Sequence, residues 1–308
     1  MTKKLELTMA CGLYDRMLDL YRGDVRPDGI TLNFIPMDGS AGAREIFDRM
    51  AGNLEFDVAE MSSSEFIARK SAGQTSLVAL PVFPSRVFRH GMCTVNRRSG
   101  IKSPKDLVGK KLAVQPGTAQ TTLLDAILAE NKLDKTKLDI VNIDPAALVG
   151  ALLEKKVDAI LAGADFQSVQ MRDRGFKVND IFYRDVGVPT VGLSIVARDD
   201  RLKESPDLYR NFVAASLKGW DEARKNPDAA AAAVIEQFPS ASKDQILKQL
   251  NVDLLLVCAP GATSLGRVPD KNWQTTFDLL TMYLNLPKDK PIGDYYSNDF
   301  LPASAPKC

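Results

Sequence analysis

The sequence predicts an α/β protein with two lobes joined by two crossing strands. Strand-like and helix-like segments alternate over residues 5–82, and a second alternating unit covers residues 99–174. Two extended segments, 91–96 and 191–198, lead into and out of this second unit, and helices dominate afterwards. One domain inserted into another is the plan of a protein whose lobes close around a ligand. Two unrelated tandem domains are the alternative.

In the first unit, each predicted strand but the last is followed by a predicted helix. Pro27-Asp28-Gly29 forms a turn before the second strand, and Ser62, Ser63 and Ser64 open the third helix. The predicted strands cover residues 5–9, 30–34, 56–60 and 77–82, and the predicted helices cover residues 14–21, 43–50 and 65–71. This rhythm predicts a mostly parallel sheet covered by helices.

The second unit repeats this rhythm on a smaller scale. Its strands are predicted at 111–114, 140–142 and 157–161, and its helices at 103–107, 120–131, 146–155 and 166–174. Later helices are predicted at 205–226, 227–237, 242–250 and 271–284, with Trp220 and Trp273 in the core. We therefore assign residues 1–94 and 195–308 to lobe 1 and residues 95–194 to lobe 2, with the tail 287–308 lying on lobe 1.

Composition excludes several classes of function. The net charge of +1 and the lack of a basic run interleaved with aromatic residues argue against nucleic-acid binding. The chain has a single histidine, and its four cysteines have no metal-ligand spacing, so we expect neither a metal nor a cofactor. No run of eighteen apolar residues exists, so no membrane insertion is expected.

The amino-terminal segment MTKKLELTMACG has no apolar signal region and is predicted to be a strand. Two locations remain open. The protein is cytoplasmic, or it is periplasmic and a signal peptide has been removed.

The serine cluster is the first candidate binding site. Ser62 and Ser63, with Met61 beside them, lie where a strand ends and a helix begins. Ligands of α/β proteins bind at the carboxyl ends of strands, and helix N–H groups and hydroxyls hold small anions. Helix capping by a serine is the alternative, and we expect it for at least one of the three.

Gly117, Thr118 and Ala119 form the corresponding turn in the second unit. Small residues let the backbone approach an anion at a helix start. An ordinary turn capped by Thr118 is the alternative. Together with the serines, this turn predicts one anion-binding helix start in each lobe.

Arg86, Arg89 and His90 precede the first crossing strand. An arginine fork matches a carboxylate, and histidine can donate a hydrogen bond or transfer a proton near neutral pH. Solvated arginines and a packed histidine are the alternative.

Further candidates lie in turns that follow strands. Tyr14 could stack on a ring or hydrogen-bond to a ligand, and Asp15 could contact it or cap the next helix. Cys11 precedes them and is expected to pack, because no base lies near it in the sequence. Asp165 and Thr190 complete the candidate ligand-binding residues, with turn chemistry as their alternative.

The second unit and the helices after it resemble the solute-binding proteins of ABC importers for sulfonates, nitrate and thiamine precursors. The resembling segments are KSPKDLVGKKLAV, the Gly117-Thr118 turn, ALLEKKVDAILAG and VGLSIVARDD, and they cover about residues 99–235. The resemblance implies two Rossmann-like lobes joined by a two-strand hinge, the type II periplasmic binding-protein fold.

The first third, residues 5–92, resembles the 4,5-dihydroxyphthalate decarboxylases. The resembling segments are MACGLYDR, VRPDGITLNFIP, FDVAEMSSSEF and ALPVFPSRVFRHG. This resemblance implies the same scaffold and an aromatic carboxylate as the molecule bound. Fold alone does not decide between a binding protein and an enzyme.

Two functions follow from these resemblances, and a third is a weaker alternative. The first is a solute-binding protein that closes over a small organic anion, an aromatic or other carboxylate, with an ABC transporter permease as partner. The second is a decarboxylase in which His90 or Asp165 supplies the proton that replaces the departing CO2. The third is a ligand-sensing protein without transport.

Overall fold

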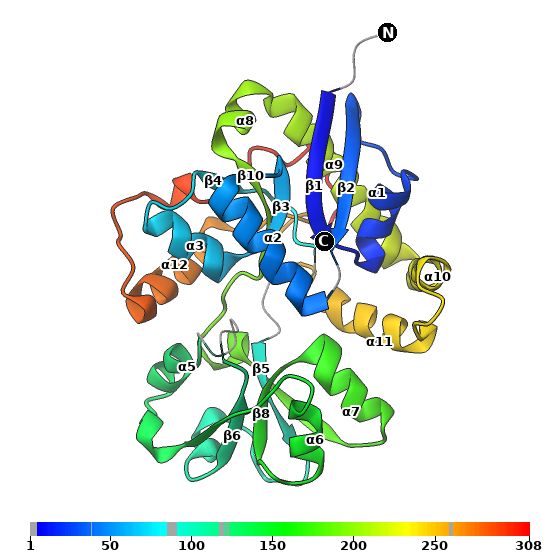
Figure 1. Ribbon diagram of the computed structural model, residues 1–308. Coiled ribbons are helices and arrows are strands. Elements are labelled where there is room, and N and C mark those ends of the chain that lie inside the picture. Colours follow the sequence, from blue (N-terminus) through cyan, green and yellow to red (C-terminus); the bar gives the residue numbers. More distant parts are fainter. Residues whose placement is uncertain (1–4, 38, 85–90, 117–120, 122, 259–260) are drawn as a thin grey trace.

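The computed structural model describes residues 5–37, 39–84, 91–116, 121, 123–258 and 261–308. It contains two five-stranded sheets with their helices, which form two lobes, one above the other in Figure 1. The sheet of lobe 1 has the order β2-β1-β3-β10-β4, and that of lobe 2 has the order β7-β6-β8-β5-β9. The predicted two-lobe α/β fold is confirmed.

The strands of lobe 1 are β1 (Leu5–Gly12), β2 (Ile30–Met37), β3 (Val58–Ser62), β4 (Leu77–Ala79) and β10 (Leu193–Arg198). The strands of lobe 2 are β5 (Gly91–Asn96), β6 (Lys111–Val114), β7 (Asp139–Asn142), β8 (Ala159–Gly163) and β9 (Val178–Phe182). The predicted lobe boundaries at 94/95 and 194/195 stay a prediction. They fall within β5 and β10, next to the two places where the chain passes between the sheets.

Lobe 1 carries the helices α1 (Leu18–Arg22), α2 (Gly39–Asn53), α3 (Ser63–Ser71), α8 (Asp199–Glu204), α9 (Pro206–Lys225), α10 (Pro227–Gln237), α11 (Lys243–Leu254) and α12 (Asp270–Leu284). Lobe 2 carries α5 (Leu124–Glu130), α6 (Leu148–Leu153), the π-helix η4 (Ala164–Ser168) and α7 (Val169–Asp173). The short 3₁₀ turns are η1 (Asp15–Met17), η2 (Pro104–Leu107), η3 (Lys135–Lys137), η5 (Tyr183–Val186) and η6 (Ile292–Asp294).

One strand in each sheet runs against the other four. β10 pairs antiparallel with β3 and β4, and β5 pairs antiparallel with β8 and β9. These two are the first strands after each crossing. The other strands of each sheet end on the side that faces the other lobe. After each crossing the chain enters the sheet from that same side, so its first strand there must run in the opposite direction. The two crossings therefore explain both antiparallel strands.

Two inner strands, β3 of lobe 1 and β8 of lobe 2, are buried along their whole length. All five residues of β3 and all five of β8 are buried, as expected for strands covered by helices on both sides.

Some element bounds differ from the prediction. The strand predicted at 77–82 is shorter, because β4 ends at Ala79, and α5 begins at Leu124 rather than at 120. β9 was not predicted at all.

Helix ends in the carboxyl-terminal region follow from capping chemistry. Pro206 and Pro227 occupy the first helical turns of α9 and α10, where a missing N–H costs nothing. The Asn226 side chain accepts from Ala229 N–H at 3.2 Å, and Ser242 Oγ starts α11 in the same way. Among the described residues, no helix is long and apolar enough to cross a bilayer.

The carboxyl-terminal tail lies on lobe 1, as predicted. Tyr296 bridges to Ala79 of β4, and its ring stacks on Trp273 at 4.8 Å between centroids. Trp220 and Trp273 are both 2% exposed, which confirms their place in the core. A disulfide between Cys258 and Cys308, which was not predicted from the sequence, holds the end of the tail.

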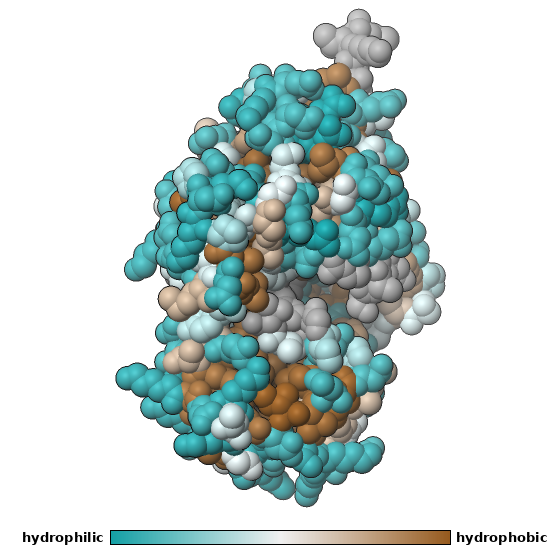
Figure 2. Space-filling view, turned by 60° about the vertical axis from the view of Figure 1, so that its left-hand side comes forward, coloured by the Kyte–Doolittle hydropathy of each residue, from teal (hydrophilic) through white to brown (hydrophobic). Residues whose placement is uncertain are grey.

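Hydropathy is distributed unevenly over the surface. In Figure 2, apolar side chains gather over the lower lobe, lobe 2, whereas the upper lobe is mostly hydrophilic on this face. Lobe 2 contributes three of the exposed large apolar side chains, namely Val108, Phe166 and Phe176. Phe176 lines a pocket of this lobe.

Candidate functional site

The candidate site is built where the carboxyl ends of strands in the two sheets face each other. In lobe 1, β10 begins at Leu193 opposite Ser62, the last residue of β3. In lobe 2, β5 begins at Gly91 opposite Gly163, the last residue of β8. The chain passes between the lobes at these ends, so the carboxyl ends of the strands in each sheet face the other lobe (Figure 1). These carboxyl ends are where α/β proteins bind ligands.

The serine cluster lies on the lobe 1 edge and is buried. The hydroxyl oxygens of Ser62 and Ser64 are 2.9 Å apart, and the Ser63 hydroxyl donates to the carbonyl of Gly192 in the crossing segment. Ser62 occupies the N-cap position of α3, yet its side chain makes no capping hydrogen bond. The capping alternative therefore does not hold for Ser62, and Ser63 ties the helix start to the crossing segment.

Thr190 lies in the crossing segment before β10. Its side chain is 3% exposed, and among the described residues its hydroxyl has no hydrogen-bond partner. The neighbouring Val191 N–H donates to Thr276 Oγ1 at 2.9 Å, which holds the segment against α12. A buried hydroxyl without a partner costs about 1–3 kcal/mol, and a ligand oxygen or a water at this edge would satisfy it.

The buried side chain of Glu60 lies against the loop after β1. It is 1% exposed and accepts hydrogen bonds from the Cys11 thiol at 3.4 Å, from the Tyr14 phenol and from Gly12 N–H. Burial raises the pKa of Glu60, and burial together with Glu60 raises the pKa of Cys11. Cys11 is thus a packed thiol rather than a nucleophile.

Gly12 allows Tyr14 to fold back toward Glu60. A Cβ at position 12 would lie 2.9 Å from Tyr14 Cζ, which is too close for two carbon atoms. The glycine therefore leaves room for the ring of Tyr14, a predicted ligand-binding residue.

Arg16 holds the same loop to the carboxyl-terminal helices. Its guanidinium contacts Asp15 Oδ1 at 2.8 Å and Asp253 Oδ2 at 2.9 Å, and it lies under the rings of Tyr14 and Trp220. Burial alone would lower the pKa of Arg16, but the two carboxylates more than offset it, so the pKa is raised. The carboxylate of Asp15, a predicted ligand-binding residue, is engaged in this ion pair.

Helix α11 connects this network to lobe 2. At its carboxyl end Asp253 pairs with Arg16, and along its length it packs against η4 and α7 of lobe 2. Lys248 on α11 donates to Asp173 Oδ1 on α7 at 2.6 Å. Figure 1 shows α11 at the side of lobe 1 that faces α7 of lobe 2.

Asp165 lies on the lobe 2 edge, directly after β8. Its Oδ1 would be 2.8 Å from a Cβ at position 163, so glycine at the strand end leaves room for the carboxylate. The side chain of Gln167 accepts from Gly163 N–H at 2.8 Å and completes this turn.

The remaining predicted site residues divide into two groups. Met61 is fully buried in the apolar core of lobe 1. The other six lie outside the described residues, namely Arg86, Arg89, His90, Gly117, Thr118 and Ala119. The structure therefore brings Cys11, Tyr14 and Asp15 together at one strand end, with Ser62 and Ser63 at the end of β3.

Glu60, Arg16 and Asp253 were missed as members of this network. Glu60 sits in an apolar strand, FDVAEM, and a charged residue inside such a strand is a signal that could have been used. Asp253 lies 237 positions after Arg16 in the chain, and no local pattern links the two.

Replacing Glu60 with glutamine should remove part of the pH dependence of stability. The native state holds the Glu60 proton more tightly than the unfolded chain does, because the pKa is raised. The contribution of Glu60 to the free energy of unfolding is therefore fully present below its unfolded pKa of about 4.5. It is lost as the pH rises from there toward the raised pKa of the native state. Across that pH window, the free energy of unfolding of E60Q should rise relative to that of the wild type by at most about 1.4 kcal/mol per pH unit.

Urea unfolding of both proteins between pH 4 and pH 8 measures this difference. Glu6→Gln, a change at an exposed position of β1, controls for the loss of one carboxylate. Parallel stability curves for wild type and E60Q would contradict the assignment of a raised pKa to Glu60.

The chain matches one family model, and its relatives include both an enzyme and a binding protein. The model of the NMT1/THI5-like family matches residues 49–230. A 4,5-dihydroxyphthalate decarboxylase from Comamonas testosteroni is 42% identical over 111 residues, which are 36% of this chain and 32% of that protein. A riboflavin-binding protein from Chloroflexus aurantiacus is 26% identical over 160 residues, 50% of this chain and 45% of that protein.

The whole chain has the fold of solved periplasmic binding proteins. The periplasmic aliphatic sulphonate binding protein SsuA from Escherichia coli superposes with a TM-score of 0.69 at 17% identity, over 94% of this chain and 91% of that one. At this identity the likeness establishes the fold alone. The chain spans about a third to under a half of the length of the two sequence relatives above.

Proposed function

This chain belongs to the NMT1/THI5-like family, and we propose that it is a solute-binding protein whose two lobes close over a small organic anion. The observation that carries the proposal is the opposed pair of strand ends. Tyr14, Ser62 and Thr190 line one edge and Asp165 lies on the other, with two crossings that can act as a hinge. An ABC transporter permease is the partner that such a protein serves.

An aromatic or other carboxylate is the ligand class that we propose. The likeness to a 4,5-dihydroxyphthalate decarboxylase supports an aromatic carboxylate, and the fold shared with a sulphonate-binding protein supports an anion. Hydroxyls at the end of β3 and a hydroxyl at Thr190 suit carboxylate oxygens. Arg86, Arg89 and His90, with the turn of Gly117, Thr118 and Ala119, remain the proposed anion contacts from the sequence.

The disulfide supports a periplasmic location. Cys258 and Cys308 are joined across 50 positions, and structural disulfides form and persist mainly in oxidising compartments. A periplasmic location is what a binding protein for uptake requires, whereas a cytoplasmic enzyme would keep these thiols reduced.

A thermal-shift panel tests the binding proposal. Phthalate, 4,5-dihydroxyphthalate, benzoate and taurine should include at least one compound that raises Tm, because a ligand at 100 times its Kd stabilises the native state by about 2.7 kcal/mol. R86A and R89A should each weaken a carboxylate hit about ten-fold or more, since each loses a charge-assisted contact. R97A, at an exposed arginine after β5, is the matched control.

No stabilisation by any compound in a broad anion panel would remove the basis of the binding proposal. Equal affinities of R86A, R89A and R97A would show that these arginines are solvated. T190V should also lose affinity, and S240A, a change at an exposed hydroxyl, should not.

The alternative function is decarboxylation on the same scaffold, and the 42% identity to the Comamonas testosteroni decarboxylase favours it. The substrate would be an aromatic dicarboxylate. The ring loses CO2, and a proton takes the place of the departing carboxyl group on the same carbon. His90 or Asp165 would supply that proton. Release of CO2 from 4,5-dihydroxyphthalate above background, abolished in H90A or D165N, would replace the binding proposal with this one.

A further inference from the structure

A pocket opens at the end of lobe 2 that faces away from lobe 1. It has a volume of about 540 Å³ and lies where β5 ends and where β8 and β9 begin. β5 runs from Gly91 at the edge facing lobe 1 to Asn96 in the pocket, and five residue steps at about 3.3 Å place the two ends roughly 17 Å apart. The pocket is therefore separate from the candidate site between the lobes.

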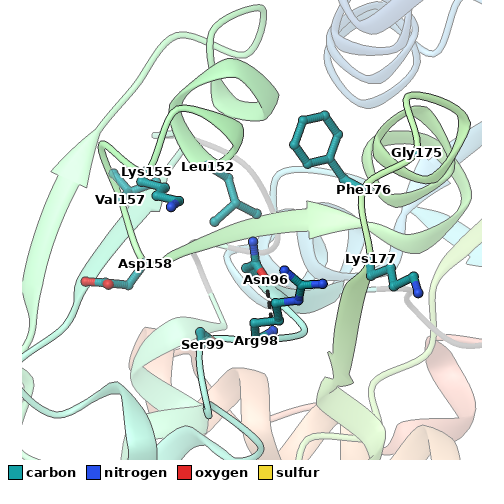
Figure 3. A pocket seen from close by; sticks show the side chains of 10 residues that line it. All are labelled: Asn96, Arg98, Ser99, Leu152, Lys155, Val157, Asp158, Gly175, Phe176 and Lys177. Atoms are coloured by element: carbon teal, nitrogen blue, oxygen red, sulfur yellow. Dashed lines mark hydrogen bonds between the residues drawn. The ribbon is translucent and has the colours of Figure 1, made fainter.

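The floor and one wall of this pocket are apolar. Leu152 and Val157 line it and are 4% and 5% exposed, and Phe176 adds an aromatic ring that is 39% exposed. In Figure 3 the side chains of Leu152, Asn96 and Arg98 gather at the centre, with Phe176 beyond Leu152. Because Leu152 and Val157 expose little surface, a flat apolar body would touch them and bury mainly the Phe176 ring.

The rim carries an excess of positive charge. Arg98, Lys155 and Lys177 line the pocket, against one carboxylate, Asp158, which accepts Lys111 N–H at 2.9 Å. None of the three cations forms an ion pair with another of the described residues. Figure 3 shows Lys155 and Lys177 on opposite sides of Arg98.

We propose that this pocket is a second binding site, for an amphipathic organic anion with one aromatic ring and one carboxylate or sulfonate group. Its volume is within the range of about 300–1,000 Å³ that small-molecule sites occupy. The ring packs on Leu152, Val157 and Phe176, and the anionic group lies among Arg98, Lys155 and Lys177. Inorganic anions bind more weakly because they lack the ring, and aromatic cations bind more weakly because the three cations repel them.

The site works independently of the space between the lobes. No residue of the pocket belongs to the candidate site, so occupancy of one does not require the other. Since the cations are exposed, each contributes modestly, and the apolar contact decides the affinity as much as the charge does.

A tryptophan in place of Phe176 reports on this pocket directly. The two native tryptophans are each 2% exposed in lobe 1, and the wild type titrated in parallel measures their own response, so a fluorescence change that only F176W shows comes from the pocket. Benzenesulfonate and benzoate should change the F176W emission with saturation. Inorganic sulfate and benzylammonium at the same concentrations should bind at least about five-fold more weakly.

Charge variants in the F176W background complete the test. R98A/K177A should weaken benzenesulfonate binding about five-fold or more, and K102A/K105A, which removes two exposed cations of the same lobe outside the pocket, should leave it unchanged. Equal weakening by both pairs, equal binding of benzylammonium, or no saturable change up to tens of millimolar would overturn the proposal. Loss of binding between the lobes leaves these results unaffected, so the two proposals fail separately.

Discussion

Replacing Arg16 with methionine should lower the free energy of unfolding by about 3–5 kcal/mol. The substitution keeps most of the apolar stem but leaves the carboxylates of Asp15 and Asp253, which are 6% and 4% exposed, without their cation. It also removes the donor to the Pro84 carbonyl and the cation over Tyr14 and Trp220. An uncompensated buried charge is the costly part of breaking such a pair. Urea unfolding followed by far-UV circular dichroism measures the change.

Two further variants separate charge from packing in that experiment. Arg22→Met removes a nearby arginine whose pair with Glu236 is exposed, and it should cost less than about 1 kcal/mol. Adding Asp253→Asn to R16M should recover part of the loss, because one orphaned carboxylate is gone. A loss as small as that of R22M would show that Arg16 does not compensate the buried acids.

The alternation of strands and helices could be predicted because it depends on local patterns. Apolar runs such as 157–161 became the fully buried β8, and the crossing segment 191–198 became β10 with only a small shift. β9 was missed because polar Asn179 and Asp180 interrupt its apolar pattern. The structure explains that interruption, since Asp180 accepts from Ser168 Oγ at 2.7 Å and Thr94 Oγ1 at 3.1 Å.

The candidate site could be predicted in part, for the same physical reason. Ser62 ends β3 and Tyr14 lies in the loop after β1, and strand ends are where α/β proteins bind ligands. The contacts that hold Tyr14 in place come from Glu60 on a neighbouring strand and from Arg16, which is fixed by Asp253 on α11. Such contacts depend on how distant segments pack, and the local pattern of a single sequence carries no record of them.

Reducing the disulfide between Cys258 and Cys308 should lower the free energy of unfolding by about 2–4 kcal/mol. The bond closes a loop across 50 positions, and opening it returns conformational freedom to the unfolded chain. The folded tail keeps other contacts, including Leu265 N–H to the Pro306 carbonyl at 2.8 Å and Arg224 Nη1 to the Lys307 carbonyl at 2.8 Å. We therefore expect the fold to survive with a less stable carboxyl-terminal region.

Unfolding in urea with and without a phosphine reductant measures the effect, and in C258S/C308S the reductant should change nothing. Thiol titration in denaturant gives an independent check. The non-reduced protein should show two thiols, from the buried Cys11 and Cys93, and the reduced protein four. Four thiols before reduction, in protein recovered from its native compartment, would mean that the bond does not form there. That result would also remove the structural support for a periplasmic location and shift the balance toward the decarboxylase, because the cytoplasm keeps thiols reduced.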